Sequence, residues 1–190
     1  MKSNLFKQLA DINLSEYSFL ITGGAGFIGS NITQFLIAKG VKKVTILDNL
    51  STGHFKNLSP FIKHNNFQFI EGDITNLKTC ELATQNVDFV LHQAALGSVP
   101  RSFKDPLATN NNNVVGFLNI ISASKKSKVK KIVFASSSAV YGDSKELPKI
   151  ETKTGKLLSP YAVSKHTKET YAKVLSEYYS IPIIGLRYFN

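Results

Sequence analysis

The segment from Phe19 to Ser30 constrains the fold more than any other part of the chain. It reads Phe-Leu-Ile-Thr-Gly-Gly-Ala-Gly-Phe-Ile-Gly-Ser, so an apolar run ends in a glycine-rich turn and passes directly into apolar residues at helical spacing. The glycines Gly23, Gly26 and Gly29 recur at every third position. Because glycine has no Cβ, such a turn leaves room for an anionic group beside the first backbone amides of a helix. The segment therefore predicts a strand–turn–helix unit that binds phosphate groups.

Apolar runs of strand length alternate with longer helical patterns along the chain. The runs are nearly continuous in apolar residues, as in strands that are buried on both faces of a parallel sheet. They cover Ser18–Gly23, Lys43–Asp48, Phe67–Glu71, Val87–His92, Lys130–Ser136 and Ile181–Arg187. The helical patterns cover Phe27–Lys39, Leu77–Thr84, Pro106–Ser127 and Pro160–Tyr179. This alternation predicts right-handed βαβ units in a doubly wound parallel α/β sheet of the Rossmann type.

The length of 190 residues predicts one domain, which we expect over residues 18–190. Residues 1–17 form an extension before it, and the sequence leaves open whether they contain a short helix. No apolar run approaches the about 20 residues of a membrane helix, and no secretory signal pattern is visible, so we expect no membrane partner. The single cysteine, Cys80, is consistent with a cytoplasmic protein.

A net charge of +10 raises the question of nucleic-acid binding. The lysines are dispersed, however, and only a modest cluster stands between Lys125 and Lys131. Dispersed lysines are typical of a solvated basic surface, which also attracts small anionic ligands. We therefore expect no nucleic acid as a partner.

Acidic residues follow the second and third predicted strands. Asp48 lies about 20 residues after the glycine turn, where a carboxylate accepts hydrogen bonds from adenosine ribose hydroxyls and repels a 2′-phosphate. The sequence therefore predicts NAD rather than NADP as the cofactor. Asp73 and Ile74 follow the third strand and are placed to border the adenine. Each aspartate also has a structural alternative, because Asp48 can cap the turn after it and Asp73 can cap the next helix.

A serine-rich strand end and a tyrosine–lysine pair form the next candidate group. Ser136, Ser137 and Ser138 follow the fifth predicted strand, and open α/β sheets bind ligands at the carboxyl ends of their strands. Tyr161 and Lys165 stand four residues apart, so both side chains project from one helix face. A tyrosine in water loses its proton at about pH 10, and a lysine ammonium beside it favours the phenolate. Tyr161 is thus predicted to be a general base, with Ser137 sharing the proton of a substrate alcohol.

Together these residues resemble the extended short-chain dehydrogenase/reductase superfamily, the NAD-dependent epimerases and dehydratases. The finer resemblance is to UDP-N-acetylglucosamine 4-epimerases, of which this chain corresponds to the N-terminal part. It spans nearly the whole chain and is carried by residues 47–54 (LDNLSTGH), 91–102 (LHQAALGSVPRS), 147–149 (LPK), 158–165 (LSPYAVSK) and 185–190 (GLRYFN). The GSVPRS stretch discriminates best among these, because galactose epimerases usually differ there.

The resemblance implies a catalytic group of Ser137, Tyr161 and Lys165, and no metal. It implies that NAD is lined by Gly23, Gly26, Phe27, Ile28, Asp48, Asn49, Ser51, Gly53, Asp73, Ile74, Gln93, Ala94, Ala95, Asn113, Tyr161 and Lys165. It implies that the sugar faces Gly97, Ser98, Val99, Ser137, Ser138, Tyr161 and Asn190. In the family's reaction the tyrosine takes the proton of the sugar 4-hydroxyl while hydride passes from C4 to NAD. The 4-keto sugar then swings over and takes the hydride back on its other face.

The main departure from the family is length. Family members continue well beyond the position of Asn190 into a part that clamps the uridine diphosphate. We therefore expect a Rossmann sheet that lacks the C-terminal substrate domain and leaves an open edge with exposed apolar surface. Two alternatives stay open, a catalytically inactive NAD-binding or assembly module and a nucleotide-sugar dehydratase or decarboxylase. A dehydratase needs an acidic pair beside the catalytic hydroxyl, where this chain has Ser138 and Ala139.

The two longest helical patterns predict a homodimer through a four-helix bundle, as the resemblance implies. Their apolar residues are Val114, Val115, Leu118, Ile121, Ala162, Tyr171, Val174 and Leu175. The same residues can instead face the sheet, and we expect this of most of them. The expected partners are thus a UDP-sugar substrate and a second copy of the chain.

Overall fold

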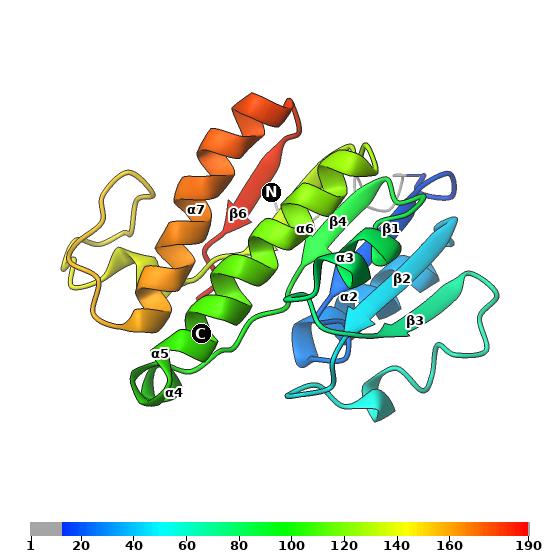
Figure 1. The fold of residues 1–190 in the computed structure, drawn as a ribbon, viewed down its shortest axis with the longest axis horizontal. Helices are drawn as coiled ribbons and strands as arrows, with labels where there is room; N and C mark the ends of the chain where they lie inside the picture. The colour runs from blue at the N-terminus through cyan, green and yellow to red at the C-terminus, as the bar shows by residue number, and fades with distance from the viewer. Residues whose placement is uncertain (1–12, 190) are drawn as a thin grey trace.

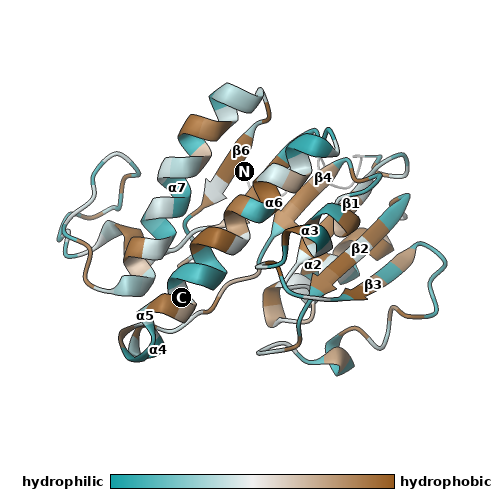
Figure 2. Cartoon of the chain, viewed as in Figure 1, coloured by the Kyte–Doolittle hydropathy of each residue, from teal (hydrophilic) through white to brown (hydrophobic). Residues whose placement is uncertain are grey.

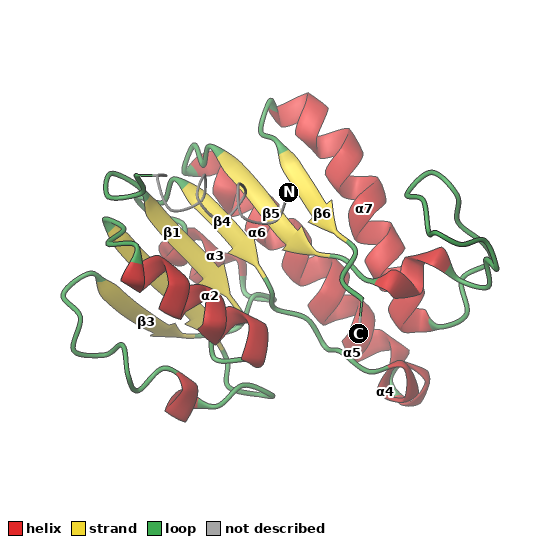
Figure 3. Cartoon of the chain, turned by 180° about the vertical axis from the view of Figure 1, so that it is seen from behind, coloured by secondary structure: helices red, strands yellow, loops and turns green. Residues whose placement is uncertain are grey.

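The computed structural model describes residues 13–189 and shows one parallel sheet with helices on both of its faces (Figures 1 and 3). Six strands lie in the order β3-β2-β1-β4-β5-β6, and every pairing is parallel. The strands are β1 Ser18–Thr22, β2 Lys43–Asp48, β3 Phe67–Glu71, β4 Phe89–His92, β5 Lys131–Ala135 and β6 Ile183–Leu186. The strand order reverses between β1 and β4, so the loops after these strands separate and leave a crevice. The predicted doubly wound α/β fold is confirmed.

Helices connect these strands on both sides of the sheet. In Figure 1, α3, α6 and α7 lie in front of the sheet, and the reverse view in Figure 3 shows α2 on the opposite face. The helices are α2 Phe27–Ala38, α3 Leu77–Ala83, α4 Val99–Lys104, α5 Pro106–Asn110, α6 Gly116–Lys126 and α7 Pro160–Tyr179. Shorter turns of 3-10 helix are η1 Phe55–Asn57 and η3 Ser138–Tyr141, and a π-helical segment, η2 Asn111–Val115, joins α5 to α6.

Strand β1 is buried on both faces, and its three central residues, Phe19, Leu20 and Ile21, are apolar. Successive side chains of a strand point to opposite faces. Leu20 therefore belongs to the cluster that contains Phe117 of α6, and Ile21 to the cluster that contains Leu36 of α2. Figure 2 shows this pattern as largely apolar central strands beside helices that carry both polar and apolar residues. The central strands are thus rigid supports for the loops at their carboxyl ends.

Two helical regions differ from the sequence prediction. The pattern over Pro106–Ser127 is interrupted, since α5, η2 and α6 follow one another. Helix α4 was not predicted; Ser98 caps it by accepting a hydrogen bond from the Arg101 amide. The short helix considered within residues 1–17 falls mostly outside the described residues, and the proposed domain boundary at residue 18 stays a prediction.

Strand β6 forms one edge of the sheet and exposes part of its apolar surface. Ile184 and Leu186 are 44% and 42% exposed, and Phe189 after the strand is 63% exposed. In Figure 3 none of the described helices lies in front of β5 and β6. The predicted open edge is therefore present in the part of the chain that the structure describes. Within that part, no helix has the length and apolar character needed to cross a membrane.

Candidate active site

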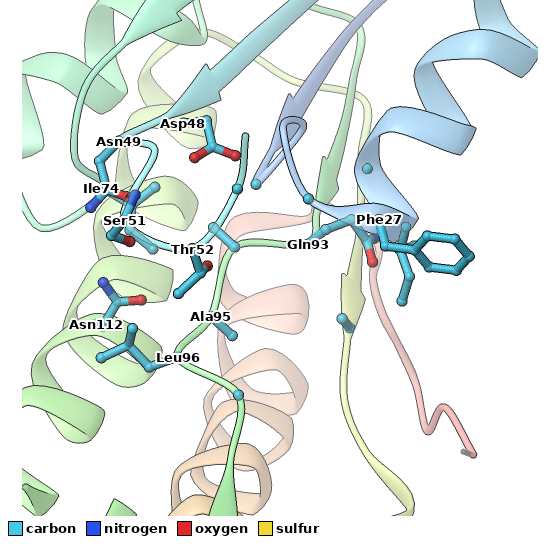
Figure 4. Close-up of a pocket in the computed structure, with 18 of the residues that line it drawn as sticks. Phe27, Asp48, Asn49, Ser51, Thr52, Ile74, Gln93, Ala95, Leu96 and Asn112 are labelled. Atoms are coloured by element: carbon cyan, nitrogen blue, oxygen red, sulfur yellow. Dashed lines mark hydrogen bonds between the residues drawn. The ribbon is translucent and has the colours of Figure 1, made fainter. Parts of the chain in front are cut away.

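A cavity of about 390 Å³ lies at the carboxyl edge of the sheet, where β1 and β4 separate (Figure 4). This volume falls within the range of about 300–1,000 Å³ that is typical of small-molecule sites. The cavity collects residues from eight separate segments of the chain, between Gly23 and Tyr188. The predicted site residues that line it are Gly23, Gly26, Phe27, Ile28, Asp48, Asn49, Ser51, Gly53, Ile74, Gln93, Ala94, Ala95, Gly97, Ser137, Tyr161 and Lys165. Most of the predicted cofactor site is thus one continuous surface.

The glycine turn between β1 and α2 forms one wall of the cavity. Gly23 has a positive φ of +70°, and a Cβ there would lie 2.7 Å from the Ala94 nitrogen. A Cβ on Gly29 would lie 2.3 Å from the Gly23 oxygen, so this glycine lets α2 pack against the turn. Gly26 is the N-cap of α2 and offers no side chain to the first amides of the helix. These amides and the positive end of the helix dipole suit a diphosphate.

The Asp48 carboxylate lies at the end of β2 on the same cavity, as Figure 4 shows. Its Oδ1 accepts a hydrogen bond from the Leu50 amide at 2.9 Å, so the turn-capping role that the sequence left open is present. Its Oδ2 accepts a 2.9 Å hydrogen bond from the Ala25 amide in the glycine turn. Each carboxylate oxygen has a further lone pair, so Asp48 can also accept hydrogen bonds from ribose hydroxyls.

Asp73 does not line the cavity, although its neighbour Ile74 does. Asp73 accepts hydrogen bonds from the Thr75 amide and from Asn49 Nδ2, both at 2.7 Å. Burial alone would raise the pKa of Asp73, but the hydrogen bonds from Thr75 and Asn49 outweigh it and lower that pKa. The N-cap of α3 is Asn76, so the proposed capping of this helix by Asp73 is wrong. Asp73 instead holds Asn49, which lines the cavity itself.

Tyr161 and Lys165 enter the cavity from the first turns of α7. Ser159 begins this helix by accepting a 3.1 Å hydrogen bond from the Ala162 amide. The Lys165 side chain is buried, and its Nζ donates a 2.8 Å hydrogen bond to the carbonyl of Ala135 at the end of β5. Burial lowers the pKa of Lys165 to about 8. Its Nζ lies 5.6 Å from the centroid of the Tyr161 ring.

The three serines after β5 have different surroundings. Ser137 lines the cavity, and its Oγ accepts a 3.1 Å hydrogen bond from the Ala139 amide. Ser136 also lines it, but its hydroxyl donates to the carboxylate of Glu169. Ser138, a predicted sugar contact, does not line the cavity. The Ser137 hydroxyl therefore faces the same space as Tyr161, which the proposed proton-sharing role requires.

Three further predicted contacts with the cofactor or the sugar lie away from the cavity. Asn113 is buried, and its Oδ1 accepts a 2.7 Å hydrogen bond from the Leu96 amide while its Nδ2 donates to Ser164 Oγ at 3.0 Å. Asn113 thus ties the segment after β4 to α7. Ser98 and Val99 lie at the start of α4 and do not line the cavity. The sugar contact predicted at Asn190 lies outside the described residues.

Several residues that line the cavity are not among the predicted catalytic, cofactor or sugar contacts. They are Leu47, Thr52, Gly72, Leu96, Asn112, Ala135, Ser136 and Tyr188. Most of them are neighbours of predicted residues in the sequence. The ends of the predicted strands therefore indicated the correct region of the fold, but not every residue in it. Asn112 stands in a polar run in which the sequence does not say which side chain faces the ligand. Among the described residues, no group of His, Cys, Asp and Glu is arranged to hold a metal.

The arrangement can bind a dinucleotide and transfer a proton at one end of it. The glycine turn and Asp48 match a diphosphate and a ribose, and the Tyr161–Lys165 pair stands across the same cavity. A phenol beside a buried lysine is an acid–base group for an alcohol. The residues present therefore fit NAD together with a hydroxyl-bearing substrate.

Comparison with known proteins places this site in a family. Residues 19–190 match the model of the NAD dependent epimerase/dehydratase family. The UDP-glucose 4-epimerase of Streptococcus mutans is 36% identical over 176 residues, which make up 91% of this chain and 51% of the relative. The chain therefore spans about half the length of such relatives.

Solved structures show the same likeness. The UDP-N-acetylglucosamine 4-epimerase of Methanobrevibacter ruminantium, solved with UDP-N-acetylmuramic acid, has 41% identity and a TM-score of 0.86 over 93% of this chain and 56% of its own. The UDP-glucose 4-epimerase of Thermus thermophilus, solved with NAD, has 38% identity and a TM-score of 0.82 over 90% of this chain and 54% of its own. The prediction of NAD as the cofactor is thus confirmed at the level of the family. The chain belongs to the NAD-dependent epimerase/dehydratase family.

Proposed function

We propose that this chain carries the NAD-binding and proton-transferring part of a UDP-sugar 4-epimerase that interconverts UDP-GlcNAc and UDP-GalNAc. One observation carries the proposal: Ser137, Tyr161 and Lys165 line the same cavity as the glycine turn and Asp48. A cofactor gripped at its diphosphate by the turn can then reach the acid–base group. The similarity to UDP-sugar 4-epimerases supports the reaction class.

In this proposal the chain's own residues bind the cofactor and move one proton. The amides after Gly26 hold the diphosphate and the Asp48 carboxylate holds the adenosine ribose. When bound, NAD supplies reversible hydride transfer. The Tyr161 phenolate takes the proton from the sugar 4-hydroxyl and the resulting phenol later returns it, while the Ser137 hydroxyl keeps that alcohol in line. Lys165, protonated at neutral pH because its pKa is about 8, stabilises the phenolate.

The choice of an N-acetylated sugar rests on two observations. The Methanobrevibacter ruminantium protein, at 41% identity, is described as a UDP-N-acetylglucosamine 4-epimerase. Gly97 lines the cavity, and nothing in the structure lies within 4 Å of the place where its Cβ would be. This open space beside the segment after β4 can take a substituent larger than a hydroxyl.

The test is incubation of the purified chain with NAD and UDP-GlcNAc, followed by NMR detection of UDP-GalNAc. UDP-glucose under the same conditions serves as the comparison substrate. Faster conversion of UDP-GlcNAc supports the proposal, and faster conversion of UDP-glucose overturns its substrate. Retention of NAD without turnover of either sugar favours the inactive NAD-binding or assembly module. Formation of a 4-keto-6-deoxy sugar or loss of CO₂ from UDP-glucuronate would identify a dehydratase or decarboxylase instead.

A homodimer and a cytoplasmic location complete the proposal. Val114, Ile121 and Ala162 are buried in the structure, as expected for most of the apolar residues on these helices. Tyr171 and Val174 are 41% and 60% exposed, and they support a second helix pair packing on α7. Val115 is also exposed, at 38%. Leu118 and Leu175 are partly buried. The sole cysteine is buried and needs no oxidising compartment.

Sedimentation equilibrium at micromolar concentration tests the dimer. Val174→Lys should shift the chain toward monomer, because it places a charge in the centre of the proposed interface. The matched control is Ile62→Lys, at an exposed apolar residue away from α7. A monomeric wild-type protein would contradict the dimer and leave the cofactor site unaffected.

A further inference from the structure

The backbone of Ala25, in the middle of the glycine turn, is held by hydrogen bonds on both sides of its Cα. Ala25 is fully buried. Its amide donates to Asp48 Oδ2 at 2.9 Å. Its carbonyl accepts a 2.8 Å hydrogen bond from Asn57 Nδ2 and a 3.1 Å hydrogen bond from the His54 amide. All three partners lie in one segment, residues 48–57, that begins with the last residue of β2.

The same segment also packs against Ala25 without a side chain in between. Gly53 is buried, and a Cβ on it would lie 2.9 Å from both the carbonyl carbon and the Cβ of Ala25. Within the turn itself the structure shows the longer 3.2 Å hydrogen bond from the Gly26 amide to the Gly23 carbonyl. Glycine-rich backbone has many accessible conformations, so the turn needs outside contacts to keep one of them. The segment after β2 provides these contacts.

Asn57 contacts Ala25 through its side chain, and its role is not explained by contact with the cavity. It ends the short η1 turn and does not line the cavity. Its amide group makes the 2.8 Å hydrogen bond to the Ala25 carbonyl. Asp48 and Gly53, in contrast, line the cavity directly.

We propose that Asn57 is a positioning residue for the cofactor diphosphate, because it and Asp48 hold the two peptide groups that flank the Ala25 Cα and so fix the amides of the glycine turn. In this arrangement the ribose-binding carboxylate of Asp48 is hydrogen-bonded to the turn that binds the diphosphate, so the two parts of the site hold each other in place. The Asn57 hydrogen bond keeps the turn in its binding shape before the ligand arrives. Preorganisation of this kind raises affinity because less ordering is left for the binding step.

The experiment measures binding to the intact chain by calorimetry for NAD and for adenosine, which lacks the diphosphate. Asn57→Ala should weaken NAD about three- to tenfold, the scale of one neutral hydrogen bond, and change adenosine affinity less than about twofold. Asn57→Asp keeps the shape of the side chain but removes the donor, so it should weaken NAD at least as much. The matched control is Ser59→Ala, which removes only a hydroxyl contact with the Lys56 carbonyl in the same loop.

Hydrogen exchange without ligand gives an independent reading of how firmly Asn57 holds the turn. The amides of residues 23–29 should exchange faster in Asn57→Ala than in wild type, while those of β4 and β5 stay unchanged. Unchanged NAD affinity in both Asn57 variants, equal losses for NAD and adenosine, or unchanged exchange in the turn would each overturn the proposal. The proposal rests on NAD binding in this cavity. Failure of the wild-type chain to bind NAD would overturn the proposed function. The hydrogen-exchange rates need no ligand, so they test separately whether Asn57 holds the glycine turn.

Discussion

The Nζ atom of Lys165 lies 5.6 Å from the centroid of the Tyr161 ring and is fixed by a 2.8 Å hydrogen bond to the Ala135 carbonyl. The lysine therefore connects α7 to the end of β5, where Ser137 follows. Its burial means that little water screens the ammonium charge from the phenol. This fixed pair is the basis of the acid–base chemistry proposed for the cavity.

Tyr161→Phe should retain NAD but lower epimerase turnover by at least about 10²-fold, because the phenol oxygen that moves the proton is gone. The measurement pairs NAD binding with UDP-GlcNAc turnover. Tyr171→Phe removes the hydroxyl of an exposed tyrosine on the same helix and should leave both readings unchanged. Full turnover by Tyr161→Phe would remove this residue from the mechanism.

Asp48→Ala should weaken NAD by about tenfold or more and narrow the preference for NAD over NADP, because the carboxylate no longer binds the ribose or repels a 2′-phosphate. Titration with both cofactors measures this preference. Glu71→Ala is the matched control, since Glu71 pairs with Asp48 in the sheet register but is exposed and does not line the cavity. An unchanged NAD/NADP ratio in Asp48→Ala would refute the ribose role.

Lys168→Met should stabilise the fold by about 1–3 kcal/mol at pH 7, the cost of burying a polar group without a partner. Lys168 is fully buried, and its Nζ has no hydrogen-bond partner among the described residues. Burial, and then the nearby charge of Lys165, hold the pKa of Lys168 well below its usual value. Urea unfolding of both proteins measures the difference.

The pH dependence of this effect has a definite sign. The folded state binds the Lys168 proton more weakly than the unfolded state, so the stability of wild type rises with pH up to the unfolded pKa of about 10.4. The increase in the free energy of unfolding that Lys168→Met gives should therefore become smaller between pH 7 and pH 9. Lys173→Met, at an exposed position of α7, should change stability by less than about 0.5 kcal/mol. A gain in stability from Lys168→Met that does not change with pH would contradict a lowered pKa of Lys168 in the folded state.

Glu169→Gln should destabilise the protein by about 1–2 kcal/mol at pH 7, because the carboxylate joins three elements of the site. It accepts hydrogen bonds from Arg187 Nε at 2.9 Å and Nη2 at 2.7 Å, and another from the Ser136 hydroxyl. Burial alone would raise the pKa of Glu169, but these hydrogen bonds outweigh it and lower that pKa. Thermal unfolding measures the loss, with exposed Glu177→Gln on the same helix as the control.

For this carboxylate the stabilisation is present above the unfolded pKa of about 4.3 and is lost as pH falls through the lower folded pKa. The difference between wild type and Glu169→Gln should therefore close below about pH 4. A difference that is the same at pH 7 and pH 3.5 would show that the ion pair does not carry the effect.

The cavity residues show where prediction from sequence reached its limit. The glycine spacing, Asp48 and the Tyr161–Lys165 pair were found because each must satisfy a local rule of backbone geometry or helix periodicity. Asn113 was assigned to the cofactor, yet it is buried and binds Leu96 and Ser164, while its neighbour Asn112 lines the cavity. A run of identical residues carries no periodic signal, so the direction of each side chain depends on how the π-helical segment packs.

The sequence by itself determined the parallel α/β fold, the order of its strands and most of the predicted cofactor residues that line the cavity. These features follow from local patterns, namely buried strands, amphipathic helices and a turn that only glycine can form. Only the tertiary structure decided that Asp48 and Asn57 hold the Ala25 backbone, that the Lys168 amine has no hydrogen-bond partner among residues 13–189, and that Glu169 joins Arg187 to Ser136. Such contacts join residues whose separation in sequence follows no period, so they arise only when the sheet brings its strand ends together.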